Sequence, residues 1–204
     1  MKKIFFIVSA LVLAQTTNIK AQDLPGWDWN VYKINQPYPG YIIKLTGDTI
    51  QGFILLNLPT DNQDKITFLP TEKDYKNKTV YKSDDLKGYM VADKVYRSIH
   101  YSGGLFSKPV RYVMVNKDGR LCSFYWYNKN DITRRIESVE VFQKVDETPF
   151  TADKFALKFT KFWGETLSDN PEMSAKIIAK EKNYTLLNMY AFIDEYNAFW
   201  ASKK

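Results

Sequence analysis

The chain has 204 residues, of which 45% are hydrophobic and 16% aromatic, and it carries a formal charge of +6. This length suits one medium domain, and this hydrophobic content is enough to build a core. The charge falls to +3 once Lys2, Lys3 and Lys20 leave with the predicted leader, and so small a surplus argues against a nucleic-acid partner.

Residues 1–21 have the pattern of a secretory signal peptide. Two lysines precede the apolar run 4–14, and a polar stretch then leads to Ala21. The run is too short for a membrane-spanning helix, which needs about 20 apolar residues, so a membrane anchor is disfavoured and no transmembrane span is expected after cleavage. We expect cleavage after Ala21, with Ala14 as the alternative site, and therefore an exported protein of the periplasm, the outer membrane surface or the extracellular space.

The first hairpin is expected around Gly47-Asp48, after an irregular lead-in of residues 22–39 that contains two tryptophans. Segments 41–45 and 49–56 read as its strands, and Gly-Asp favours a two-residue turn. If those two residues alone form the loop, Leu45 faces Ile50 across the pair.

The second hairpin is expected to turn at Asp118-Gly119, between segments 111–116 and 121–127. Pairing across this turn places Val115 opposite Cys122. One face then carries Val113, Val115, Cys122, Phe124 and Trp126. The other, called the tyrosine face, carries Tyr112, Met114, Ser123, Tyr125 and Tyr127. Further strands are predicted at 65–69, 86–92, 95–101 and 134–145, with Asp93-Lys94 as a turn.

The pattern switches to helical after Pro149. Helices are predicted at 151–167, from Asn170-Pro171 to Ala179, and from Thr185 to about Ser202. The predicted fold class is α+β: a twisted antiparallel β-sheet or partial barrel over residues 40–148, followed by a C-terminal three-helix segment, 149–204, packed on the sheet. An outer-membrane barrel is the rival, but regular strands of about ten residues with aromatic girdles are lacking.

The candidate ligand-binding residues are Tyr112, Tyr125 and Tyr127. Exposed aromatic rings on a rigid sheet can stack on a sugar or anchor a protein partner. The alternative is that the C-terminal helices, which need to bury their apolar stripes, cover this face and make it core.

No catalytic residue, metal site or cofactor is predicted. His100 and Cys122 are the single histidine and the single cysteine, and no carboxylate run has the spacing of a calcium loop. Ser98 shares a strand face with His100, but no nucleophile motif accompanies them, so His100 is expected at a rim. Cys122 is expected to be a small buried hydrophobe.

Two segments resemble a family of uncharacterised exported proteins of Bacteroidota. They are GYIIKLTGDTIQGFI, from Gly40 to Ile54, and the helical tail from Ser168 to Asn197; a leader ending in Ala21-Gln22 is also similar. The resemblance implies a Gram-negative exported protein. The family brings no established activity and no catalytic residues.

These observations together favour an exported, non-enzymatic binding or envelope-structural protein. Its expected partner is an unknown envelope protein or a glycan. The alternative is a hydrolase that acts on glycans or peptides through acidic residues or His100.

Overall fold

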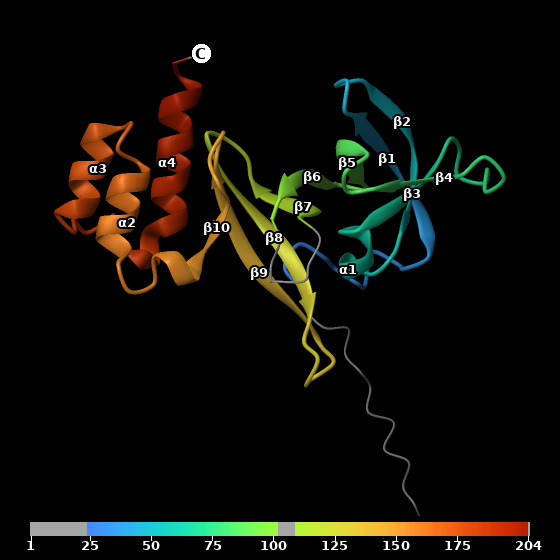
Figure 1. Ribbon diagram of the computed structural model, residues 1–204, viewed down its shortest axis with the longest axis horizontal. Helices are drawn as coiled ribbons and strands as arrows, with labels where there is room; N and C mark the ends of the chain where they lie inside the picture. The colour runs from blue at the N-terminus through green and yellow to red at the C-terminus, as the bar shows by residue number, and fades with distance from the viewer. Residues whose placement is uncertain (1–23, 102–108, 204) are drawn as a thin grey trace, which may run out of the picture.

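The computed structural model describes residues 24–101 and 109–203 (Figure 1). The predicted signal peptide and its cleavage site therefore lie outside the described residues. Within the described part of the chain, no helix has both the length and the apolar character that crossing a membrane requires.

One sheet of ten antiparallel strands forms the body of the protein, in the order β10-β9-β8-β7-β6-β5-β1-β2-β3-β4. This sheet and the helices at its end confirm the predicted α+β class with an antiparallel sheet. The strands are β1 (Gln36–Lys44), β2 (Thr49–Leu56), β3 (Lys65–Leu69), β4 (Thr79–Lys82), β5 (Leu86–Val91), β6 (Lys94–His100), β7 (Val110–Lys117), β8 (Leu121–Lys129), β9 (Ile136–Lys144) and β10 (Phe150–Thr151).

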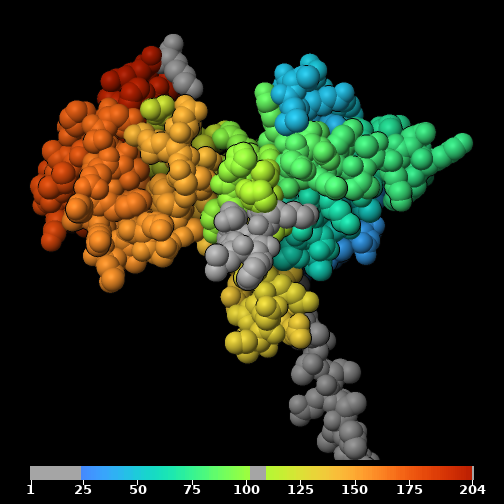
Figure 2. Space-filling view, in the orientation of Figure 1, coloured from blue at the N-terminus to red at the C-terminus, as the bar shows by residue number. Residues whose placement is uncertain are grey.

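The helices that follow β10 gather at one end of the sheet. Figure 1 shows them beside β8, β9 and β10, with β1 to β4 at the far end, and Figure 2 shows two masses on either side of the yellow-green middle strands. The helical elements are α1 (Pro59–Asn62), η1 (Ala152–Lys154), α2 (Phe159–Thr166), α3 (Pro171–Ile178), η2 (Leu186–Asn188) and α4 (Met189–Ala201).

The register predicted for the first hairpin is wrong. Ile50 pairs with Ile42 and not with Leu45, because the loop is longer than two residues: the N–H of Lys44 donates to the carbonyl of Asp48 at 2.9 Å. The shift by an odd number of residues exchanges the two faces of β1. Ile42 is therefore fully buried, whereas Leu45 is 58% exposed.

The second hairpin keeps its predicted faces although its register also differs. Val115 pairs with Phe124 instead of Cys122, and the register shifts between Val115 and Lys117. A displacement by two residues leaves each side chain on its own face. The apolar face is accordingly one cluster, made of Ile99, Val113, Cys122, Phe124 and Val141 with Tyr101, Val115 and Trp126 beside it.

Other boundaries differ by small amounts from the prediction. Strand β3 has its predicted bounds, whereas the turn before β6 consists of Ala92 and Asp93, since Val91 pairs with Lys94. The predicted limits of the β domain, 40 and 148, both fall short, because β1 begins at Gln36 and β10 lies at 150–151. The short edge strand β4 was not predicted from the sequence.

The helical segment is confirmed in part. Asn170 accepts a hydrogen bond from the Met173 N–H at 3.2 Å and begins α3, as its sequence predicts. The predicted helix 151–167 is α-helical only in α2, after η1 and a turn, and α4 begins later than Thr185. These helices enclose a cluster of Leu121, Phe142, Phe155, Trp163, Leu167, Met173, Ile177, Tyr184, Met189, Phe192, Ile193 and Tyr196.

Candidate functional site

Two of the three predicted binding tyrosines lie in the core. Tyr112 is 0% exposed and Tyr127 is 1% exposed, so neither ring offers surface to a ligand; Tyr125 is half-buried against the same cluster. For Tyr112 and Tyr127, the alternative interpretation is therefore the correct one: they are core residues. The cover differs from the expected one, because this end of the face lies under the lead-in and not under the C-terminal helices.

The lead-in crosses the tyrosine face at close range. Gly26 has a φ of +84°, a conformation that favours glycine, and a β-carbon there would come within 2.0 Å of the end of the Met114 side chain, which would have to move. The hydroxyl of Tyr127 donates to the carbonyl of Pro25. Leu24 and Trp27 are buried in the same cluster as Tyr112 and Tyr127.

Gln63, which follows α1, closes the gap where β7 and β8 separate. Its side-chain amide donates to the Tyr127 carbonyl at 2.7 Å and accepts from the Tyr127 N–H. Its own carbonyl accepts from the Tyr112 N–H at 3.0 Å. Gln63 thus supplies the pairing that the neighbouring strands no longer give each other, and no local sequence signal predicts this role.

Aromatic rings of the lead-in and β1 form a stack that runs outward from the buried Trp27. Trp29 stacks on Trp27 with ring centroids 5.3 Å apart and an interplanar angle of 12°. Tyr32 meets Trp27 edge-on at 5.4 Å, and Tyr38 meets Tyr32 at 5.7 Å. Each ring is held by another ring, so this wall is rigid before anything binds.

An apolar groove of about 320 Å³, called the aromatic groove, runs along this wall. It is lined by Leu24, Trp29, Tyr32, Lys33, Ile34, Leu58, Pro59 and Ile136. These residues come from the lead-in, the start of α1 and strand β9. Ile34 is 38% exposed and Leu58 is 40% exposed, so apolar surface continues to the rim.

Polar contacts fix the rim of the aromatic groove. The Tyr32 hydroxyl donates to Asp93 at 2.7 Å, and this bond, together with burial, raises the pKa of Tyr32 to about 12. Burial alone would raise the pKa of Asp93, but hydrogen bonds from Lys94 and Tyr32 outweigh it and lower that pKa. Tyr32 therefore stays neutral, and Asp93 stays ionised, over the physiological pH range.

The residues considered for catalysis are not assembled into a site. The hydroxyl of Ser98 donates to the carbonyl of Ser83 and not to His100, which lies exposed at the end of β6. Cys122 is 4% exposed, and burial raises the pKa of its thiol although Arg97 donates to the sulfur at 3.3 Å. Among the described residues, no group of three potential metal ligands occurs.

Comparisons with protein-family models, with curated proteins and with solved structures found no match to this chain. Any functional assignment therefore rests on the geometry of the molecule. The two tryptophans of the lead-in, Trp27 and Trp29, could be identified from the sequence. Leu58 and Ile136 could not be identified from it as residues of the groove. Their only signal is the presence of apolar residues next to turns, which does not show that they meet.

Proposed function

We propose that this protein is an exported, non-enzymatic binding module that holds an apolar side chain of a protein partner in the aromatic groove. The observation that carries the proposal is the exposed apolar groove with its wall of stacked aromatic rings. Solvent-accessible apolar grooves of this kind mark interaction sites more often than they mark idle surface.

The groove suits an apolar side chain better than a sugar. A sugar needs several free hydrogen-bonding groups on the walls of its site. Here one donor of the Lys33 ammonium is bound to the Trp29 carbonyl at 3.0 Å, and the Tyr32 hydroxyl donates to Asp93. The remaining lining side chains are apolar, apart from the Trp29 indole N–H.

Rigidity supports the same function. A partner loses affinity when the surface that it meets must first become ordered. Trp29 is held by Trp27, and Tyr32 by Asp93 and Tyr38, so the groove requires little ordering. Buried aromatic anchors of this type supply most of the binding free energy in many protein interfaces.

Affinity capture from the native cell envelope tests the groove. We expect a protein that is retained by the wild type and lost with Trp29→Ala. Tyr75→Ala is the matched control, because Tyr75 is an aromatic residue that is 48% exposed and lies away from the groove. If every captured protein binds Trp29→Ala as well as it binds the wild type, the groove is not the binding site.

Export is tested separately. Residues 1–21 are proposed to be removed, so mass analysis of the protein from its native host should find Gln22 as the new N-terminus. Intact Met1 in a membrane fraction would contradict both the cleavage and the proposed periplasmic, surface or extracellular location.

A further inference from the structure

A second cavity, of about 760 Å³, lies between the β7–β8 turn and α4. We call it the cationic cleft. Its lining residues are Arg97, Asp118, Gly119, Arg120, Val145, Asn197, Trp200, Ala201 and Lys203. It shares no lining residue with the aromatic groove, so a ligand of this cleft is independent of the function proposed for the groove.

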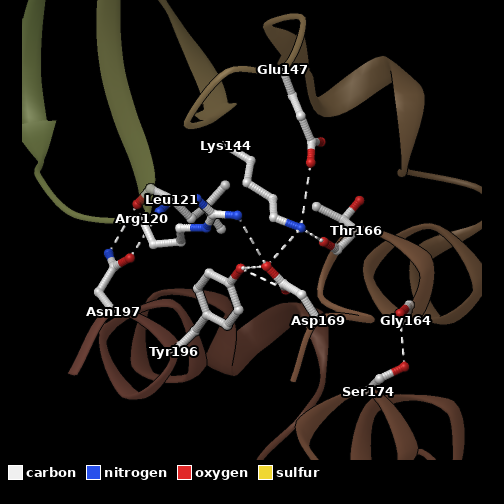
Figure 3. Close-up of polar contacts among 10 residues, drawn as sticks. All are labelled: Arg120, Leu121, Lys144, Glu147, Gly164, Thr166, Asp169, Ser174, Tyr196 and Asn197. Atoms are coloured by element: carbon white, nitrogen blue, oxygen red, sulfur yellow. Dashed lines mark hydrogen bonds and ion pairs between the residues drawn. The ribbon is translucent and has the colours of Figure 1, made fainter. Parts of the chain in front are cut away.

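The floor of the cationic cleft is held rigidly (Figure 3). Asn197 accepts from the Leu121 N–H and donates to the Leu121 carbonyl, both at 2.9 Å. Asp169 receives the Tyr196 hydroxyl at 2.7 Å and the Lys144 ammonium at 3.1 Å. These contacts therefore join the β7–β8 turn and α4 to each other and to the segment around Asp169 at the cleft.

The charges around the cleft leave one positive charge in excess among the described residues. Arg97 is paired with Asp118 at 2.6 Å, and Arg120 approaches Asp169 at 3.5 Å. Lys203 has no carboxylate partner within the described chain and instead lies over the ring of Phe199, 3.9 Å from its centroid. Lys144, which contacts both Asp169 and Glu147, and the half-exposed Glu147 add one charge of each sign and leave the balance unchanged.

Two donors in the wall of the cleft have no acceptor. The Nε of Arg120 and the Nε1 of Trp200 are both buried, and neither makes a hydrogen bond to any described residue. Their side chains stack on each other, with the guanidinium carbon 5.1 Å from the indole centroid. A buried donor without an acceptor costs about 1–3 kcal/mol, so a ligand that supplies acceptors to these two donors gains binding free energy.

We propose that the cationic cleft binds a carboxylate carried by a small ligand. The carboxylate pairs with Lys203 and accepts from Arg120 and Trp200, whose donors become accessible when the guanidinium moves off the indole ring. A single excess positive charge matches a carboxylate, with its one negative charge, better than a phosphate group, which carries about −1.5 to −2 at pH 7. Two acceptor oxygens also match the two unpaired donors.

Titration of the ¹⁵N-labelled protein, followed by NMR at the indole N–H signals, tests this inference. The probes are D-glucuronate and N-acetylglycine, which are sugar and amino-acid carboxylates, against D-glucose and N-acetylglycinamide, which are neutral, all at constant ionic strength. We expect at least one carboxylate to give a saturable shift of the Trp200 signal, assigned with Trp200→Phe, while the buried Trp27 and Trp163 signals stay fixed. The tighter carboxylate identifies the ligand class.

Variants make the test decisive. Lys203→Gln should weaken carboxylate binding about tenfold, since a charge-assisted contact is lost. Lys161→Gln, at an exposed lysine of α2, is the control and should leave the affinity unchanged. The proposal is overturned by no saturable shift with either carboxylate, by an equal response to the neutral probes, by tighter binding of inorganic phosphate, or by an unchanged affinity in Lys203→Gln.

Discussion

The two ends of the tyrosine face are covered by different segments and by different kinds of interaction. At one end, Tyr112 and Tyr127 lie under the lead-in and Gln63, and their polar partners are neutral. At the other end, Leu121 and Phe142 lie under the helices, in a cluster whose border holds charged groups. The first cover extends the hydrogen bonding of the sheet, whereas the second is an apolar cluster closed by ion pairs.

Tyr125 lies between the two covers. Its neighbour across the strand pair, Glu140, accepts a hydrogen bond from Tyr190 of α4, and Tyr125 itself packs beside the core cluster that contains Tyr127. One strand, β8, therefore takes part in both covers. This arrangement suggests that the two ends respond differently to polar substitutions but share one apolar support on the opposite face.

The largest expected effect is at that shared support. Phe124 is 1% exposed and lies on the opposite face of β8, so Phe124→Ala should lower the free energy of unfolding by about 3–5 kcal/mol. Tyr125→Ala, at the half-buried neighbouring position, should cost less than about 1 kcal/mol. Denaturant unfolding of both variants gives the values. Equal losses would mean that both faces of β8 are buried equally at this position.

The faces of the second hairpin could be predicted from its sequence, while the registers could not. Alternation of side chains fixes which residues share a face, and a displacement by two residues preserves it, as for Val115 and Phe124. The loop from Leu45 to Asp48 depends instead on local hydrogen bonds, among them Thr46 to Asp48 at 2.7 Å. The sequence pattern also contains Gly47-Asp48, which fits a shorter turn equally well.

The second largest loss of stability is expected at the cover formed by the lead-in and Gln63, which we call the neutral cover because its polar groups carry no charge. Gln63→Ala removes both side-chain bonds to the Tyr127 backbone and leaves a buried N–H and a buried carbonyl unpaired. We expect a loss of about 2–3 kcal/mol, nearly independent of pH, because no ionisable group takes part. Gln51→Ala, at an exposed glutamine of β2, should change stability by less than about 0.5 kcal/mol. If Gln63→Ala also costs less than about 0.5 kcal/mol, water takes over the hydrogen bonds that the Gln63 amide makes to Tyr127.

Neither Gln63 nor the aromatic groove could be predicted from sequence, and the reason is the same for both. Gln63 lies 64 positions before Tyr127, and β1 pairs with β5 although β2, β3 and β4 lie between them in the sequence. Such contacts depend on the order of the strands in the sheet, which local periodicity does not specify. The helical cap at Asn170, by contrast, depends on adjacent residues and was predictable.

The smallest loss of stability is expected at the cover formed by the C-terminal helices, which we call the charged cover because ion pairs close it. Its dependence on pH should differ most from that of the neutral cover. Burial alone would raise the pKa of Asp169, but hydrogen bonds from Tyr196 and Lys144 and the nearby cations outweigh it and lower that pKa. A carboxyl group with a lowered pKa in the folded protein stabilises it above the unfolded value of about 3.9, and this stabilisation disappears as the pH falls through the folded value. The charged cover should therefore weaken in acid while the neutral one does not.

Asp169→Asn tests this directly. At pH 7 the variant should be less stable than the wild type by about 1–2 kcal/mol, because charge-assisted bonds at a partly exposed site are lost. The difference should shrink as the pH falls below about 4, since the wild-type carboxyl is then protonated as well. Thermal unfolding of both proteins from pH 7 to pH 2 measures it, with the exposed Asp153→Asn as the control. A difference that stays constant over this range would mean that Asp169 acts through packing and not through its charge. The two covers would then not differ in how their stability depends on pH.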